Sequence, residues 1–226
     1  MTTVLPLIGQ AYALAAVYHV DQRRKYTGEP YICHPVEVQQ LLQTHFGPGR
    51  DAPHLQQMYA AALLHDVLED TYATETALAQ YMPPEVVRLV VELTDVSRPE
   101  DGNRAARKAL DRAHIASGSP AAQTIKYCDV ISNTRSIAAH DPKFSRVYMQ
   151  EMVLLLQALD KGDLELRQAA IDSVGQACLR HGMDPVALGL FQNMNGPVAH
   201  GTALPDLDLA LNSPRVSRRG SAPQTF

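Results

Sequence analysis

Apolar residues recur at intervals of three and four along almost the whole chain up to His181. This spacing is typical of helices with one buried face, and only short pairs such as Val86-Val87 resemble a strand. The pattern therefore predicts an all-α fold, a bundle of about eight to ten helices. The expected helices span residues 6–24, 35–46, 53–68, 74–81, 84–93, 104–116, 121–138, 142–160 and 164–181.

The chain changes character after His181. Gly and Pro become more frequent, the helical periodicity is lost, and the residues from Ser213 onward are rich in Ser, Pro and Arg. A segment of this composition buries too few apolar side chains to offset the entropy lost on ordering. We expect one helical domain over 1–181 and an extension over 182–226, with disorder in about its last 14 residues.

Composition narrows the class of protein. The chain has 226 residues, of which 46% are hydrophobic, enough for one well-formed core. No apolar run approaches the ~20 residues that span a bilayer, and no secretory signal is recognisable, so a cytoplasmic protein without a membrane partner is expected. Three widely spaced cysteines argue against a disulfide framework, and the net charge of −4 gives no broad surface for nucleic acid.

The strongest chemical signal is the run His65-Asp66-Val67-Leu68-Glu69-Asp70, which follows the apolar run 58–64. On one continuous helix, His65 and Glu69 share a face. Carboxylates near a helix C-terminus oppose the helix dipole, at a cost of about 0.3–1 kcal/mol each, so a purely structural role is disfavoured. One divalent cation could bind His65 and Asp66. The alternative is an ordinary polar pair with Glu69 and Asp70 in solvent.

Further ligands must come from other helices. His34 precedes Pro35 at an expected helix start, and Asp129 lies four residues before Asn133 on another helix. Together with His65 and Asp66 they give two imidazoles and two carboxylates. This mixture without a thiolate favours Mn²⁺, Fe²⁺ or Mg²⁺ over structural zinc. Taken singly, His34 as a helix cap and Asp129 as a salt-bridge partner of Lys126 remain open.

Several motifs occur together, in order and at characteristic intervals. They are His-Val-Asp-Gln-Arg-Arg-Lys at 19–25, Gly-Glu-Pro-Tyr-Ile-Cys-His-Pro at 28–35, Ala-Leu-Leu-His-Asp at 62–66, Glu-Asp at 69–70, and Ser119-Pro120 through Asp129 and Asn133. The sequence over 6–180 resembles the hydrolase domain of the RelA/SpoT homologues. It is most similar to the small alarmone hydrolases, which are stand-alone members of the HD superfamily.

The resemblance implies a fold, a metal and a reaction. The implied fold is the helical HD-domain bundle, with Mn²⁺ held by His34, His65, Asp66 and Asp129. Glu69 and Asp70 are implied to position and activate the attacking water. The implied substrate is a guanosine or adenosine nucleotide with a 3′-pyrophosphate, hydrolysed to the 5′-di- or triphosphate nucleotide and pyrophosphate. A metal that polarises a phosphoryl oxygen beside a carboxylate that accepts a proton is suited to this reaction.

A substrate with four or five phosphates needs cations. Arg24 and Lys25 match nucleotide-binding positions of the family, and Asn133 matches a position near the ribose. Three further basic residues share one face of the helix expected over 104–116 and suit a leaving pyrophosphate, although a solvated basic face explains them equally well. These three are Arg104, Arg107 and Lys108.

The chain departs from the family pattern near the base. Val130 stands where Lys or Arg is usual, Ser132 stands where an aromatic residue or His is common, and one extra residue lies between Lys25 and Gly28. The resemblance implies that Val130 and Ser132 frame the nucleoside pocket, so the choice between guanine and adenine stays open.

Two other functions remain. One is another HD-type phosphohydrolase, such as one that removes the 2′-phosphate of NADPH. The other is a non-enzymatic module that binds a nucleotide or a toxin. Retention of Glu69 and Asp70 argues against the non-enzymatic module, because binding alone does not need a water-activating pair.

Overall fold

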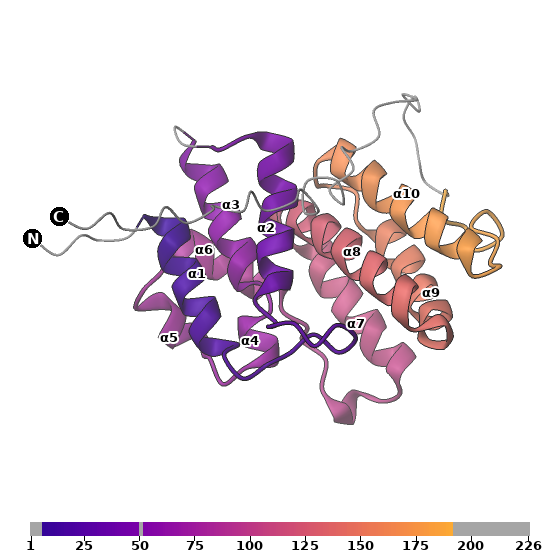
Figure 1. The fold of residues 1–226 in the computed structure, drawn as a ribbon, viewed down its shortest axis with the longest axis horizontal. Coiled ribbons are helices and arrows are strands. Elements are labelled where there is room, and N and C mark those ends of the chain that lie inside the picture. The colour runs from indigo at the N-terminus through magenta and orange to yellow at the C-terminus, as the bar shows by residue number, and fades with distance from the viewer. Residues whose placement is uncertain (1–5, 50–51, 192–226) are drawn as a thin grey trace, which may run out of the picture. The chain divides into compact units, whose positions relative to one another are not determined.

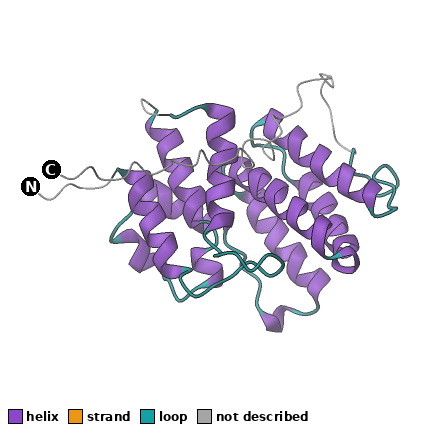
Figure 2. Ribbon diagram, in the orientation of Figure 1, coloured by secondary structure: helices purple, strands orange, loops and turns teal. Residues whose placement is uncertain are grey.

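A computed structural model describes residues 6–49 and 52–191. This part of the chain contains ten α-helices, one 3-10 helix and no strand, which confirms the all-α prediction (Figures 1 and 2). In chain order the elements are α1 (Leu7–Tyr18), α2 (Cys33–Phe46), α3 (Pro53–Leu64), α4 (Val67–Asp70), α5 (Glu75–Ala79), α6 (Pro84–Leu93), η1 (Pro99–Asp101), α7 (Arg104–Ser117), α8 (Pro120–His140), α9 (Pro142–Ala158) and α10 (Leu164–Arg180).

Two helices form the centre of the bundle. Every residue of α3 from Met58 to Leu64 is buried, and this helix contacts α1, α2, α6 and α8. The helix α8 is buried over most of 122–134 and contacts α2, α3, α6, α7, α9 and α10. Over these stretches both helices are buried on nearly all sides, as expected of helices inside a bundle. Polar side chains on these two helices are therefore held in the protein interior.

Most expected boundaries are confirmed. Gly47 follows the end of α2 with φ of 78°, a conformation that glycine adopts without strain. Asn103 and Ser119 cap α7 and α8 by accepting hydrogen bonds from the N–H groups three residues on. The helix α2 begins at Cys33 rather than Pro35, because proline is tolerated anywhere in a first turn.

The first helix is shorter than the sequence predicted. Instead of continuing to Arg24, α1 ends at Tyr18, and a loop runs to Ile32. The loop folds back on itself, because the Arg24 N–H donates to Glu29 O at 2.8 Å and the Tyr31 N–H donates to Gln22 O at 3.1 Å. Arg24 therefore lies in a loop and not at a helix end.

The helix expected over 53–68 is two helices. It breaks at His65 and Asp66, and the four-residue helix α4 follows. At the break, the carbonyl of Ala62 accepts a hydrogen bond from His65 Nδ1 at 2.8 Å. In a continuing helix this carbonyl would accept a hydrogen bond from a backbone N–H group. The His65 side chain competes for the carbonyl, and this competition is a physical cause of the break.

The predicted extension lies mostly outside the described residues. Its first part is described as far as 191, where Leu190 is buried against α10 at Gly175. The boundary after His181 and the disorder of the last residues stay predictions, since 192–226 lie outside the described residues. Among the helices of the described ranges, none combines the length and apolar character that crossing a membrane requires.

A buried aspartate holds the connection between α6 and α7. Asp111 accepts hydrogen bonds from the Val96 N–H at 3.1 Å, the Ser97 N–H at 2.8 Å and the Ser97 hydroxyl at 3.0 Å. Burial alone raises the pKa of Asp111, but the hydrogen bonds from Ser97 and the nearby Lys108 outweigh burial and lower that pKa. The same connection carries Asp95, which lies beside Glu69.

We expect Asp111→Asn to lower the free energy of unfolding by about 1–3 kcal/mol at pH 7, because the amide replaces one of the two accepting oxygens. The folded-state pKa of Asp111 is lowered, so its contribution is complete above the ordinary aspartate pKa of about 3.9 and is lost as the pH falls further. Urea unfolding of the wild type and of Asp111→Asn between pH 7 and pH 3 measures this. The difference between their free energies of unfolding should become smaller as the pH approaches 3. Asp172→Asn, on an exposed site of α10, is the control. A difference that stays constant with pH would contradict the assignment.

Candidate metal and catalytic site

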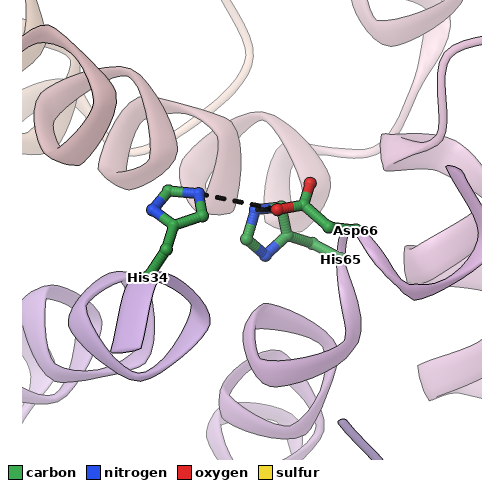
Figure 3. A group of neighbouring side chains, drawn as sticks. All are labelled: His34, His65 and Asp66. Atoms are coloured by element: carbon green, nitrogen blue, oxygen red, sulfur yellow. Dashed lines mark ion pairs between the residues drawn. The ribbon is translucent and has the colours of Figure 1, made fainter. Parts of the chain in front are cut away.

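The four predicted ligands come together from three parts of the chain. His34 lies in the first turn of α2, His65 and Asp66 lie at the break between α3 and α4, and Asp129 lies in α8. His34 Nε2 is 3.1 Å from Asp129 Oδ1 and 3.6 Å from Asp66 Oδ2. His65 Nε2 is 3.1 Å from Asp66 Oδ2 and 3.7 Å from Asp129 Oδ1. Figure 3 shows both imidazoles pointing at the Asp66 carboxylate.

This donor set fits a divalent cation. One ligand atom each of His34, His65 and Asp66 lies within 4.8 Å of the others. His65 Nδ1 carries a hydrogen, because its partner is the Ala62 carbonyl, which only accepts. The Nε2 atoms of both histidines are buried without a hydrogen-bond partner. Buried imidazole nitrogens that converge with carboxylate oxygens at 3.1–3.7 Å are donors that a divalent cation binds.

The charges of the cluster also favour a cation. Burial alone raises the pKa values of Asp66 and Asp129, but the adjacent histidines, and Lys126 beside Asp129, outweigh burial and lower both pKa values. Burial alone lowers the pKa of His65, while the two carboxylates raise it well above its ordinary value. The carboxylates therefore stay ionised and attract positive charge, which a proton or a metal ion can supply.

Asp129 is held from both sides. Lys126 Nζ lies 2.7 Å from Asp129 Oδ2, and Asn133 Nδ2 donates to Asp129 Oδ1 at 2.6 Å. The pair with Lys126, which the sequence offered as an alternative to metal binding, therefore exists together with the contacts to the histidines. Arg24 Nη1 donates to Asn133 Oδ1 at 3.4 Å, so two predicted nucleotide-binding residues adjoin the cluster.

Glu69 and Asp70 lie on α4, directly after the cluster. Glu69 Oε2 accepts a hydrogen bond from the Asp95 N–H at 3.3 Å. Desolvation, together with the carboxylates of Asp95 and Asp66, raises the pKa of Glu69 to about 7. Desolvation and Asp66 also raise the pKa of Asp70. Glu69 is therefore suited to accept and release a proton near neutral pH.

Sequence reasoning missed Tyr31. Its hydroxyl lies 2.7 Å from Asp66 Oδ2 and 3.1 Å from Asp70 Oδ2, so it connects the ligand cluster to α4. Burial and the neighbouring carboxylates raise the pKa of Tyr31, so the hydroxyl keeps its hydrogen. The sequence feature that could have identified Tyr31 is its position three residues before His34, just ahead of α2.

Two of the three predicted cations of α7, Arg104 and Lys108, are paired with carboxylates of the protein. Arg104 forms a bidentate pair with Glu151, at 2.6 and 2.8 Å. Lys108 lies 2.5 Å from Asp95, and Arg107 has a buried Nε without a hydrogen-bond partner. Lys25 is 72% exposed and lies 3.5 Å from Asp141. The contacts of Arg104 and Lys108 anchor the region around α7, and a role in substrate binding stays a prediction for all of these residues.

The two positions expected to frame the nucleoside pocket face the interior. Val130 is fully buried, and Ser132 is 1% exposed with its hydroxyl against His34. Burial does not decide whether they line a nucleoside pocket, so that expectation stays a prediction. Ser132 lies beside the candidate ligand His34, a contact that the spacing of apolar residues on α8 does not reveal.

The family model described as an HD domain matches residues 11–159, a range that includes all four candidate ligands. The chain belongs to the HD-domain family. It is similar to the guanosine-3′,5′-bis(diphosphate) 3′-pyrophosphohydrolases called MESH1. It is 36% identical to the human protein over 135 residues, which cover 59% of this chain and 71% of that one. It is 33% identical to the Xenopus tropicalis protein over 164 residues, which cover 72% and 87%.

Two further comparisons extend this result for the HD-domain chain. It is 38% identical over 93 residues to the GTP pyrophosphokinase rsh of Brucella ovis, but these residues are 11% of that protein. A solved structure, described as a metazoan orthologue of SpoT that hydrolyses ppGpp, superposes with a TM-score of 0.65 at 25% identity. The superposition covers 81% of this chain and 99% of the chain of the solved structure. These matches confirm the family resemblance drawn from the motifs.

We expect the protein to bind one divalent ion per chain and to lose this ion in Asp66→Ala or Asp129→Ala, because each substitution removes one donor from the cluster. Chelator-treated protein titrated with Mn²⁺ in a calorimeter, with thermal unfolding in parallel, measures this. The ion should raise the melting temperature of the wild type but not of the two site variants, since a ligand stabilises only the state that binds it. Asp172→Ala is the control, and an ion bound equally well by both site variants would contradict the ligand assignment.

Proposed function

We propose that this HD-domain protein removes pyrophosphate from the 3′ position of guanosine 3′,5′-bis(diphosphate), the substrate named for its MESH1 relatives. The observation that carries the proposal is the pair of buried histidine Nε2 atoms facing the carboxylates of Asp66 and Asp129, with Glu69 and Asp70 on the short helix that follows. In the reaction, water adds to the phosphorus and the bond to the ribose 3′ oxygen breaks. The products are the 5′-diphosphate nucleotide and pyrophosphate.

The proposed metal is Mn²⁺, held by His34, His65, Asp66 and Asp129. Nitrogen and oxygen donors without a thiolate suit this ion, and other divalent ions of similar preference remain candidates. When bound, it supplies a Lewis acid for the phosphoryl oxygen and lowers the pKa of a water molecule.

The proton of the attacking water is assigned to Glu69. Its carboxylate makes one long hydrogen bond to the chain and has a pKa near neutrality. Asp70 is held more firmly, because Tyr31 contacts its carboxylate at 3.1 Å and Gln22 Nε2 donates to its carbonyl at 2.5 Å. We assign Asp70 to orienting the water and Glu69 to accepting its proton.

The nucleotide is assigned to the loop and helix beside the cluster. Arg24 and Asn133 adjoin Asp129, and Lys25 on the same loop is open to solvent. Arg107 is the preferred cation of α7 for a phosphate, since its Nε is unpaired. We place the enzyme in the cytoplasm and expect guanosine or adenosine 3′-pyrophosphates as partners, without nucleic acid or membrane.

We expect Mn²⁺-loaded protein to release pyrophosphate from ppGpp, and ppApp tested in parallel reports the choice of base. Separate assays for pyrophosphate and phosphate distinguish this reaction from removal of the 2′-phosphate of NADPH, which yields phosphate. No pyrophosphate from either nucleotide would overturn the proposed function. Binding of ppGpp without turnover would instead identify a non-enzymatic module.

We expect Glu69→Gln to bind Mn²⁺ as the wild type does and to lower kcat by about 10²- to 10⁴-fold, because the amide cannot accept the proton. Stopped assays on metal-loaded protein measure kcat, and calorimetry measures the retained metal. Glu75→Gln, at an exposed position in the first turn of α5, is the control. An intact kcat in Glu69→Gln would assign the proton to another group.

A further inference from the structure

Ser132 lies directly behind His34, on the side away from the carboxylates. Its Oγ is 2.9 Å from His34 Nδ1 and 2.7 Å from Glu37 Oε2. Both Ser132 and His34 are 1% exposed, so their contact with each other is shielded from solvent. The proposed mechanism assigns no role to Ser132 or Glu37.

The direction of these two hydrogen bonds follows from the groups that make them. An ionised carboxylate has no hydrogen to give, so the Ser132 hydroxyl donates to Glu37. A hydroxyl has one hydrogen, and towards His34 it can therefore offer only a lone pair. His34 must donate, which places a hydrogen on Nδ1. In the neutral ring, the form that binds a metal ion, Nε2 then carries the lone pair.

This tautomer is the one that the cluster requires. His34 Nε2 lies 3.1 Å from Asp129 Oδ1 and 3.6 Å from Asp66 Oδ2, so with the hydrogen on Nδ1 the lone pair of the neutral ring points at the place where the candidate ligands converge. We propose that Ser132, oriented by Glu37, is a positioning residue that fixes His34 with its hydrogen on Nδ1 and thereby prepares Nε2 to bind the metal ion. This inference rests on the metal site of the proposed function.

The two histidines reach the same state by different means. His65 donates from Nδ1 to the Ala62 carbonyl, a group that can only accept. His34 instead faces a hydroxyl, which either donates or accepts. The tautomer of His34 therefore depends on Glu37. Because the Ser132 hydroxyl donates its hydrogen to Glu37, it can only accept a hydrogen bond from His34. Groups behind a ligating histidine typically change metal affinity by about 10–100-fold when mutated.

A substitution at Glu37 tests this arrangement without removing a buried side chain. Its side chain is 37% exposed, and its other oxygen lies 3.9 Å from Arg135. Glu37→Ala frees the Ser132 hydroxyl to donate to His34 Nδ1, whereas Ser132→Ala removes the hydroxyl altogether. The exposed Gln40, on the same helix, provides a matched control as Gln40→Ala.

The experiment compares these variants with the full-length wild type. In chelator-treated, ¹⁵N-labelled protein, the imidazole nitrogen shifts of His34 and His65 are followed upward in pH until both rings are neutral. His34→Asn identifies the His34 signals. Calorimetry then gives the Mn²⁺ affinity of each protein.

We expect His34 Nδ1 to carry the hydrogen in the wild type and in Gln40→Ala. In Ser132→Ala and in Glu37→Ala, the tautomer with Nε2 protonated becomes populated, and Mn²⁺ affinity falls about 10–100-fold. His65 stays unchanged throughout and serves as the internal reference. If Ser132→Ala does not fold, Glu37→Ala still decides the question.

Two results would overturn the inference: a wild-type His34 with its hydrogen on Nε2, or unchanged His34 signals and unchanged affinity in both variants. The test needs no turnover. A wild-type protein that shows the expected tautomer but no ppGpp hydrolysis would refute the proposed function and leave the assignment of Ser132 standing.

Discussion

The structure depends on keeping two imidazole nitrogens and two carboxylates inside an apolar helix bundle. Burying such groups is costly unless each has a partner, and here the partners come from several helices at once. His65 follows the apolar helix α3 into the interior, and α8 carries Asp129 there. The remaining polar groups serve this arrangement, because Lys126 and Asn133 hold Asp129 while Ala62 and Ser132 hold the far sides of the histidines.

Much of this could be predicted from the sequence. The helical period, the turn glycines and the capping residues located most helix boundaries, since these signals are local. Motifs in a fixed order named the four ligands, which the structure then places together. The breaks at Tyr18 and Leu64 could not be predicted in this way. Each depends on a hydrogen bond between a side chain or a loop and the backbone, and the spacing of apolar residues contains no sign of it.

The basic residues of α7 show a second limit of sequence reasoning. Their spacing places them on one face, but spacing does not reveal what lies opposite that face. Glu151 on α9 and Asp95 before α7 face two of them, so much of their charge is balanced within the protein. Ser132 shows the same limit, because its place in the sequence does not reveal that its hydroxyl lies between His34 and Glu37.

The loop over 19–31 is tied to α4 at two points, through Gln22 and Tyr31, which both contact Asp70. The same loop carries Arg24 and Lys25. The segment that the proposed function assigns to the nucleotide is therefore linked by hydrogen bonds to the helix that carries Glu69 and Asp70. If the nucleotide binds there, a change in the loop acts on the position of Asp70 as well as on binding. A change in loop length beside Lys25 would then alter turnover together with affinity.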